Sequence, residues 1–114
     1  SAADAKPLPS LTLAQVAEQV EKRDGRTFIF DSNPRDMYVK EHVPGARWVP
    51  YDAVTAKVLP ADHSATLIFY CANPQCSASP HAARSAVALG FTNVYVMPEG
   101  IFGWTAAGLP VEKG

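Results

Sequence analysis

The chain has no excess of positive charge and no long apolar run, and each shortage excludes a class of function. Ten Lys and Arg residues stand against eleven Asp and Glu residues, and no run of Lys or Arg exceeds two. A nucleic-acid-binding surface needs a basic footprint, so we expect no nucleic acid partner. The longest apolar stretch, Leu67 to Ala72, has six residues. A membrane-spanning helix needs about twenty, so we expect no membrane partner.

Cysteine is also scarce. Cys71 and Cys76 are too few for a disulfide-stapled scaffold and too few to form a zinc site alone. Adding His81 still leaves a zinc ion without an evident fourth ligand, so we expect no metal, and we expect no other cofactor. With 47% hydrophobic and 18% charged residues, the 114-residue chain has the composition of one folded domain.

The first ten residues are small, contain proline and lack hydrophobic periodicity. We expect residues 1–10 to be a disordered lead-in and residues 11–114 to form a single domain, which we take to be a monomer. The lead-in is similar to the start of a mature secreted protein after signal removal. This favours a periplasmic or otherwise exported location, with a cytoplasmic protein or an expression remnant as alternatives.

Hydrophobic patterning predicts alternating strands and helices. Thr12 and Gln15 have the spacing of a capping box, which predicts a helix that Gly25 stops. Apolar runs rich in β-branched and aromatic residues predict strands at 27–31, 47–50, 66–71 and 93–97. Proline, glycine and capping signals predict further helices at 34–40, 52–59, 80–89 and 101–107.

Three of these strands are nearly continuous apolar runs. That pattern is typical of strands buried on both faces, as in a parallel sheet covered by helices. The chain is therefore predicted to be an α/β protein with three layers. Right-handed crossovers place the carboxyl ends of such strands along one edge, where open α/β sheets form their binding crevice.

Cys71 ends the strongest predicted strand. The loop 72–78 follows, and we expect Ser79 to cap a helix that begins at Pro80. Unpaired N–H groups at a helix N-terminus and in a curled loop stabilise an anion, and such a setting lowers the pKa of a thiol. The arrangement predicts a nucleophilic thiolate that accepts an anionic substrate. The alternative is a buried core cysteine at the end of an apolar strand.

Four segments carry a resemblance to a known family. They are FIFDSN, EHVPGARWVP, LIFYC followed by a helix and LGF, and EGIFGW followed by AGLPV. Over residues 11–111 the chain resembles single-domain rhodaneses, which are sulfurtransferases. The resemblance implies a sheet of about five parallel strands with helices on both faces. It also implies that Cys71 accepts sulfur from thiosulfate or another donor as a persulfide, and passes it to cyanide or a thiol.

The active-site loop departs from the family pattern. Family loops have the form C-R-x-G-x-R, whereas Cys71 is followed by a longer loop without Lys or Arg. Backbone N–H groups then become the main anion-binding element. The candidate loop residues are Ala72, Asn73, Pro74, Gln75, Ser77, Ala78 and Ser79. Ser77 stands where the related C-x5-R phosphatases need arginine, so we do not expect phosphatase activity.

Three nearby side chains have open roles. Cys76 could form a disulfide with Cys71, resolve a persulfide or sulfenate on it, or only pack the loop. His81 either raises the local potential or relays a proton, or it is simply exposed. Asp31 either orients the loop from the same sheet edge or caps the turn before Pro34.

The leading hypothesis is a thiosulfate-type sulfurtransferase that acts through a Cys71 persulfide. Its partners would be a small anionic sulfur donor and a thiol or cyanide acceptor. A second hypothesis is a redox protein that cycles a Cys71–Cys76 disulfide. A third is a non-catalytic rhodanese-like binding module, since a fold does not determine a function.

Overall fold

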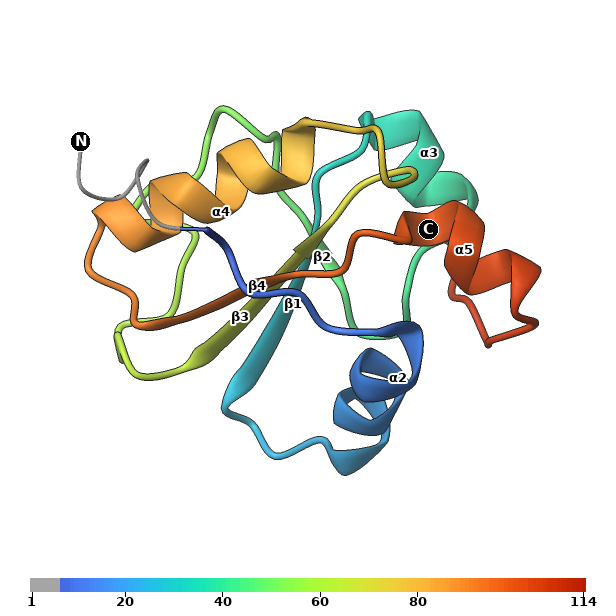
Figure 1. Cartoon of the computed structure of the whole chain (residues 1–114), viewed down its shortest axis with the longest axis horizontal. Helices are drawn as coiled ribbons and strands as arrows, with labels where there is room; N and C mark the ends of the chain where they lie inside the picture. The colour runs from blue at the N-terminus through green and yellow to red at the C-terminus, as the bar shows by residue number, and fades with distance from the viewer. Residues whose placement is uncertain (1–6) are drawn as a thin grey trace.

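The strands form one parallel sheet with helices on both sides. The computed structural model describes residues 7–114. The elements are α2 (Leu13–Lys22), β1 (Thr27–Asp31), α3 (Arg35–Lys40), β2 (Arg47–Trp48), β3 (Thr66–Tyr70), α4 (Ala78–Ala88), β4 (Asn93–Val96) and α5 (Gly100–Ala106). The strand order is β2-β1-β3-β4, and all neighbouring pairs are parallel (Figure 1). The predicted α/β class is confirmed. Within residues 7–114, no helix has the length and apolar character needed to cross a membrane.

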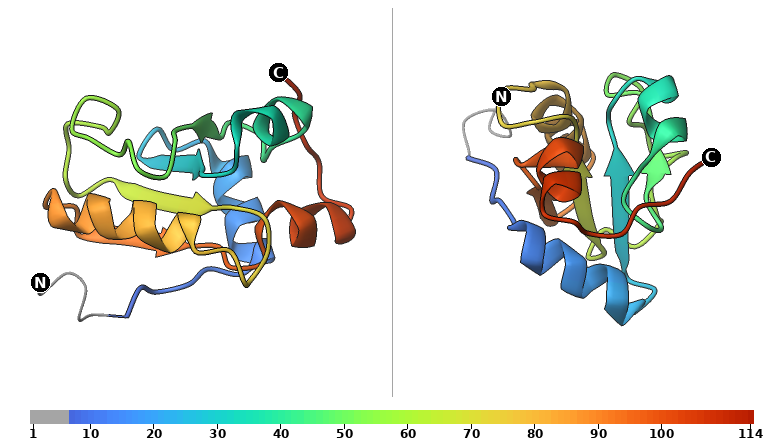
Figure 2. Two further views of the ribbon diagram at one scale, coloured as in Figure 1. Left: turned by 90° about the horizontal axis from the view of Figure 1, so that it is seen from above. Right: turned by 90° about the vertical axis from the view of Figure 1, so that its right-hand side faces the viewer.

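Strand β3 contributes to a hydrophobic core on each face of the sheet. Leu67 and Phe69 pack in one core with the buried alanines of α4. Ile68 and Tyr70 pack in the other, with side chains of α2 and α5. Figure 2 shows these helices on both sides of the strands. Because both faces of β3 are covered, its sequence is a continuous apolar run and does not alternate with polar residues.

The capping box at the start of α2 is confirmed. The Gln15 N–H donates to Oγ1 of Thr12 over 3.1 Å, and the Thr12 N–H donates to Oε1 of Gln15 over 2.8 Å. These bonds satisfy two backbone donors that the first turn of a helix leaves free. The helix ends at Lys22, and Arg23 adopts the left-handed conformation as its C-cap.

The predicted number of strands was too high. The sheet has four strands, whereas about five were expected. A fifth segment makes a single parallel bridge, between Ser10 and Val96. There the Leu11 N–H donates to the Val96 carbonyl over 2.8 Å, and the Val96 N–H donates to the Pro9 carbonyl over 3.1 Å. Pro9 itself has no N–H, which limits the ladder at this edge.

The same contacts correct part of the predicted lead-in. Residues 1–6 of that segment lie outside the described residues. Leu8 is half-buried and packs against the core on the α4 face. Pro9 and Ser10 pair with β4. Residues 8–10 therefore contact the domain that was predicted to begin at residue 11.

The predicted helix at 52–59 is wrong. This segment forms turns, in which the Ala53 N–H donates to the Pro50 carbonyl and the Val58 N–H donates to the Thr55 carbonyl. β-Branched residues lose side-chain freedom in a helix, so local preference for one is weak here. Burial of Val54 and Leu59 in the core on the α4 face decides the path of the chain instead.

Candidate active site

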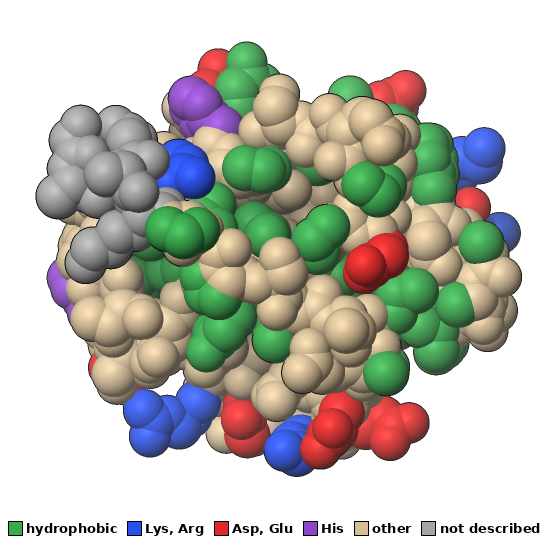
Figure 3. All heavy atoms as spheres, viewed as in Figure 1, with side chains coloured by type: hydrophobic (Ala, Val, Ile, Leu, Met, Phe, Trp, Pro, Cys, Tyr) green, Lys and Arg blue, Asp and Glu red, His purple; other side chains and the backbone are tan. Residues whose placement is uncertain are grey.

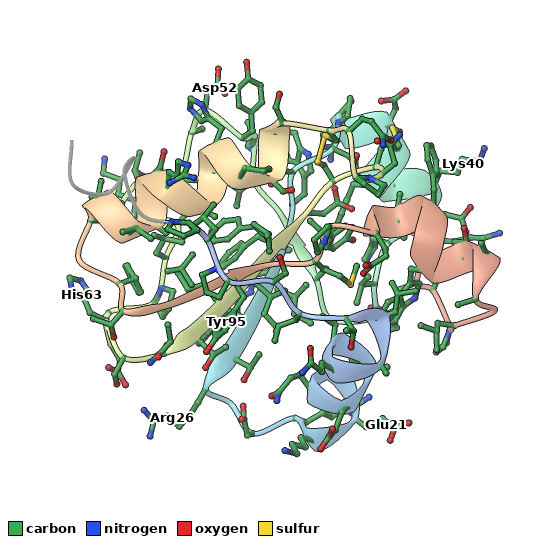
Figure 4. All side chains as sticks on the ribbon, viewed as in Figure 1. Glu21, Arg26, Lys40, Asp52, His63 and Tyr95 are labelled. Atoms are coloured by element: carbon green, nitrogen blue, oxygen red, sulfur yellow. A yellow bond between two sulfur atoms is a disulfide. The ribbon has the colours of Figure 1, made fainter. Side chains whose placement is uncertain are left out.

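Cys71 follows directly after β3, at the carboxyl edge of the sheet. Its side chain is buried, and it forms a disulfide with Cys76, whose Cα lies 6.4 Å from that of Cys71. Figure 4 shows this disulfide as a yellow bond near the start of α4. Cys76 is half-buried, so of the two sulfur-bearing residues it is the more accessible from solvent.

A short turn brings Cys76 back to Cys71. The Cys76 N–H donates to the Asn73 carbonyl over 3.1 Å. The Gln75 N–H donates to the side-chain oxygen of Asn73 over 3.0 Å. Asn73 therefore holds both its own turn and the backbone of Cys76, which is a common use of asparagine in loops.

The first turn of α5 holds the other side of the loop. The Ile101 N–H donates to the Cys71 carbonyl over 2.9 Å, and the Phe102 N–H donates to the Ala72 carbonyl over 3.0 Å. Gly100 makes this approach possible, because a Cβ there would lie 2.5 Å from the Ala72 carbonyl carbon. Its φ of +65° is also one that favours glycine.

The sequence prediction did not include Gly100 among the site residues. The available signal was a glycine in the EGIFGW segment, at the edge where parallel strands end. The sequence contains no direct sign that this glycine meets the backbone after Cys71. The close approach depends on how β4 and α5 pack against β3.

Ser79 contacts the sulfur of Cys71. Helix α4 begins at Ala78, two residues before the predicted start, and Ser77 is its N-cap without a side-chain capping bond. Ser79 is therefore not the cap but a buried first-turn residue, with Oγ 3.3 Å from Sγ of Cys71. A sulfur in a disulfide has no proton, so the Ser79 hydroxyl is the donor. The same hydroxyl is placed to donate to a thiolate after reduction.

The structure does not bring His81 to the sulfur atoms. His81 is exposed, and its ring packs edge-on against Tyr51 with 5.3 Å between the ring centroids. No acidic side chain lies in the first turn of α4, so no carboxylate there neutralises the positive end of the helix dipole.

Asp31 lies on the opposite face of the sheet from the sulfur of Cys71. It is the register partner of Tyr70, whose side chain packs on the α2 and α5 face, whereas Cys71 meets Ser79 of α4. Oδ1 of Asp31 accepts the Asn33 N–H over 2.8 Å. The carboxylate thus closes the turn after β1, which matches the turn-capping alternative.

Burial makes the charge of Asp31 costly. The side chain is fully buried, and Oδ2 makes no hydrogen bond. Desolvation raises the pKa of Asp31, and the Tyr70 hydroxyl and Asn33 work against that rise. The pKa of Tyr70 is raised as well, first by burial and then by the negative charge of Asp31.

Residues 71–83, which form the loop after β3 and the first half of α4, contain no Lys or Arg. Lys40, on α3, extends away from the disulfide in Figure 4. On the face in Figure 3, the Lys and Arg side chains are scattered and form no continuous patch. Within residues 7–114 no three His, Cys, Asp or Glu side chains are grouped to hold a metal ion. The polar side chain that the structure places at Sγ of Cys71 is the Ser79 hydroxyl, in the first turn of α4.

The chain is similar in structure to several known proteins. One is a rhodanese-like domain from Anabaena sp., with 24% identity and a TM-score of 0.70 over 95% of this chain and 81% of that one. Another is a thiosulfate sulfurtransferase from Pseudomonas aeruginosa, with 28% identity and a TM-score of 0.79 over 94% of this chain and 20% of that one.

One curated relative is named as a transcriptional regulator and not as a sulfurtransferase. It is an HTH-type transcriptional regulator of Mycobacterium tuberculosis, 29% identical over 99 residues, or 86% of this chain. The chain spans 43% of that protein's length. The rhodanese-like domain model matches residues 12–107, which is most of the chain. The match supports sulfurtransferase-type activity at the level of the family, and the chain belongs to the rhodanese-like domain family.

Proposed function

We propose that the protein is a sulfurtransferase that carries sulfane sulfur on Cys71. The reduced Cys71 thiolate attacks the outer sulfur of a donor such as thiosulfate. The S–S bond of thiosulfate breaks, sulfite leaves with the electron pair, and a Cys71 persulfide remains. A thiol or cyanide then attacks the outer sulfur, and the Cys71 thiolate leaves.

The position of Cys71 is the observation that carries this proposal. The residue stands between the end of β3 and the start of α4, in a rhodanese-like domain. Its carbonyl is held by Ile101 of α5, and its sulfur lies 3.3 Å from the Ser79 hydroxyl. A hydroxyl donor and the N-terminal end of a helix both stabilise a thiolate over a neutral thiol.

The loop chemistry bears on the donor and the compartment. Without Lys or Arg between residues 71 and 78, a doubly charged donor receives help mainly from neutral hydrogen-bond donors. We therefore propose a small anionic sulfur donor that binds more weakly than in a cation-bearing loop.

A disulfide in the site is consistent with an oxidising compartment, which supports our proposal of a periplasmic or otherwise exported monomer.

Intact-mass spectrometry of the reduced protein tests the function. After addition of thiosulfate we expect a gain of one sulfur atom in the Cys76→Ser protein and none in Cys71→Ser. The Cys76→Ser protein is the matched control, because it also loses the disulfide but keeps Cys71. A Cys71→Ser protein that still takes up sulfur would contradict the proposal.

The observed disulfide favours a second candidate function, a thiol–disulfide redox protein. It would exchange electrons with other thiols and need no sulfur donor. Titration against glutathione distinguishes it, since a redox protein interconverts fully between dithiol and disulfide without thiosulfate. If neither sulfur uptake nor interconversion occurs, a non-catalytic binding module remains.

A further inference from the structure

We propose that Cys76 resolves the Cys71 persulfide before any external acceptor does: it attacks Sγ of Cys71, releases hydrosulfide and leaves the disulfide seen in the structure. This inference rests on the sulfurtransferase function proposed above. It changes the product of the protein from a transferred sulfur to free sulfide, and it makes a dithiol reductant the partner that completes the cycle.

The geometry begins with the reach of Cys76. Its Cα lies 6.4 Å from that of Cys71, and the two sulfurs are bonded. The Asn73 turn keeps the backbone of Cys76 at this position through its 3.1 Å hydrogen bond. A thiol held on the same loop as the persulfide acts at a high effective concentration, which for well-oriented groups far exceeds that of a dissolved thiol.

Atoms and electrons balance in this step. The Cys76 thiolate attacks Sγ of Cys71 in the protonated persulfide. The bond between Sγ and the outer sulfur breaks, and the outer sulfur leaves with the electron pair as hydrosulfide, HS⁻. A disulfide between Cys71 and Cys76 forms. The two cysteines are oxidised, and the sulfane sulfur is reduced to sulfide.

The lack of cations in the loop favours this internal route. An external anionic acceptor, such as cyanide, would find no Lys or Arg between residues 71 and 78 to attract it. Cys76 needs no such attraction, because the chain delivers it. The feature that weakens the binding of external anions therefore leaves the intramolecular step unaffected.

The exposure of the two cysteines indicates which sulfur is attacked when a reductant opens the disulfide again. Cys71 is 2% exposed, whereas Cys76 is half-buried at the edge of the loop. A dithiol reductant reaches Sγ of Cys76 first, and Cys71 then leaves as a thiolate. Oγ of Ser79, 3.3 Å from Sγ of Cys71, is placed to donate a hydrogen bond to that thiolate. The second thiol of the reductant then displaces Cys76, and the reductant becomes a cyclic disulfide.

A single-turnover experiment without oxygen tests the inference. The protein is reduced, freed of reductant and mixed with one equivalent of thiosulfate, and sulfite, sulfide and intact mass are measured. We expect the unaltered protein to release one sulfite and one sulfide per chain and to end two hydrogens lighter than the dithiol. With sulfate in place of thiosulfate it should stay a dithiol, which controls for stray oxidation.

The Cys76→Ser and Cys76→Ala proteins supply the comparison. Each should release sulfite, keep the sulfur on Cys71, and release sulfide at least about tenfold more slowly until a dithiol such as dithiothreitol is added. Two replacements guard against a folding defect caused by either one.

Two results would overturn the inference, and they differ. If the unaltered protein retains the persulfide as long as Cys76→Ser does, Cys76 does not resolve the persulfide, although the sulfur carrier function stands. If no protein releases sulfite, the carrier function itself is wrong, and the role of Cys76 falls with it.

Discussion

The two halves of the loop after β3 are held in different ways. Cys71 and Ala72 lie against the first turn of α5, and the carbonyl of each accepts a hydrogen bond from a backbone N–H of that helix. Residues 73–77 are mostly exposed, with hydrogen bonds inside their own turn and a disulfide to the first half. The comparison indicates that the tertiary structure positions Cys71, while a local turn presents Cys76. A sulfur carrier that is resolved internally, as we propose, needs both properties.

The largest effect is expected from Gly100→Ala, which disturbs the contact between α5 and the first half of the loop, Cys71 and Ala72. The Gly100→Ala side chain would lie 2.5 Å from the Ala72 carbonyl carbon, so α5 or the loop must shift. We expect a loss of about 3 kcal/mol in the free energy of unfolding, from backbone strain and steric clash together. Sulfur uptake by Cys71 should fall as well, because its carbonyl anchor moves.

Gly108→Ala is the matched control for this change. Gly108 has a similar φ, +75°, but a Cβ there would have nothing within 4 Å. It should lose only about 1 kcal/mol, the cost of the left-handed conformation alone. Urea denaturation measures both proteins. Equal losses would show that the close approach of Gly100 to the loop contributes nothing.

The second prediction concerns the buried carboxyl group of Asp31, which pairs in register with Tyr70 just before Cys71. Burial raises the pKa of Asp31 above its ordinary 3.8, so the folded protein binds its proton more tightly than the unfolded chain does. As the pH rises from about 3.8 through the folded pKa, this group therefore lowers stability, by about 1.4 kcal/mol for each pH unit that separates the folded from the unfolded pKa. Asp31→Asn removes that loss, so the variant should gain stability relative to the unaltered protein as the pH rises, and the gain should then level off.

Asp62→Asn is the exposed counterpart, with the opposite sign. Hydrogen bonds from Ser64 lower the pKa of Asp62, so this carboxylate contributes stability that is lost as the pH falls through its folded pKa. The Asn variant should therefore become less stable than the unaltered protein as the pH rises. Urea denaturation between about pH 3 and pH 8 measures both differences, and trends of the same sign would refute the contrast between buried and exposed carboxylates.

The smallest effect is expected at Ser79. Ser79→Ala removes the hydroxyl next to Sγ of Cys71, and a hydrogen bond of this kind contributes about 1 kcal/mol. In a Cys76→Ser background, alkylation of Cys71 by iodoacetamide near neutral pH should slow about fivefold, since less of the thiol is ionised. Ser85→Ala is the control, because Ser85 lies on the same helix but donates to the His81 carbonyl. Equal rates in the two proteins would exclude a role for Ser79.

Much of the secondary structure could be predicted because its signals are local. The strand predicted at 27–31 has the same bounds as β1, and those predicted at 66–71 and 93–97 each exceed β3 and β4 by one residue. An apolar run between turn residues needs no knowledge of its neighbours. The segment at 52–59 was mistaken for a helix because Pro60 is typical of a helix end, whereas burial of Val54 and Leu59 in the core decides its path.

The candidate site could likewise be predicted where its signals are local, and not where they depend on packing. The order strand, Cys71, loop and helix was readable from the sequence, as was the possibility of a Cys71–Cys76 disulfide. The start of α4 was misplaced by two residues, and this changed Ser79 from a helix cap to a contact of the sulfur. Helix ends vary by one or two residues more readily than helix centres do, so local signals place them less well.

By itself, the sequence determined the fold class, the family resemblance and the place of Cys71 between a strand and a helix, because each is carried by short segments whose patterns can be read one at a time. Only the tertiary structure decided that Gly100 lies against Ala72 and that Asp31 lies on the face away from the sulfur of Cys71. Those relations join segments from different strands and helices. They follow from how the sheet twists and packs, and local patterns do not carry that information.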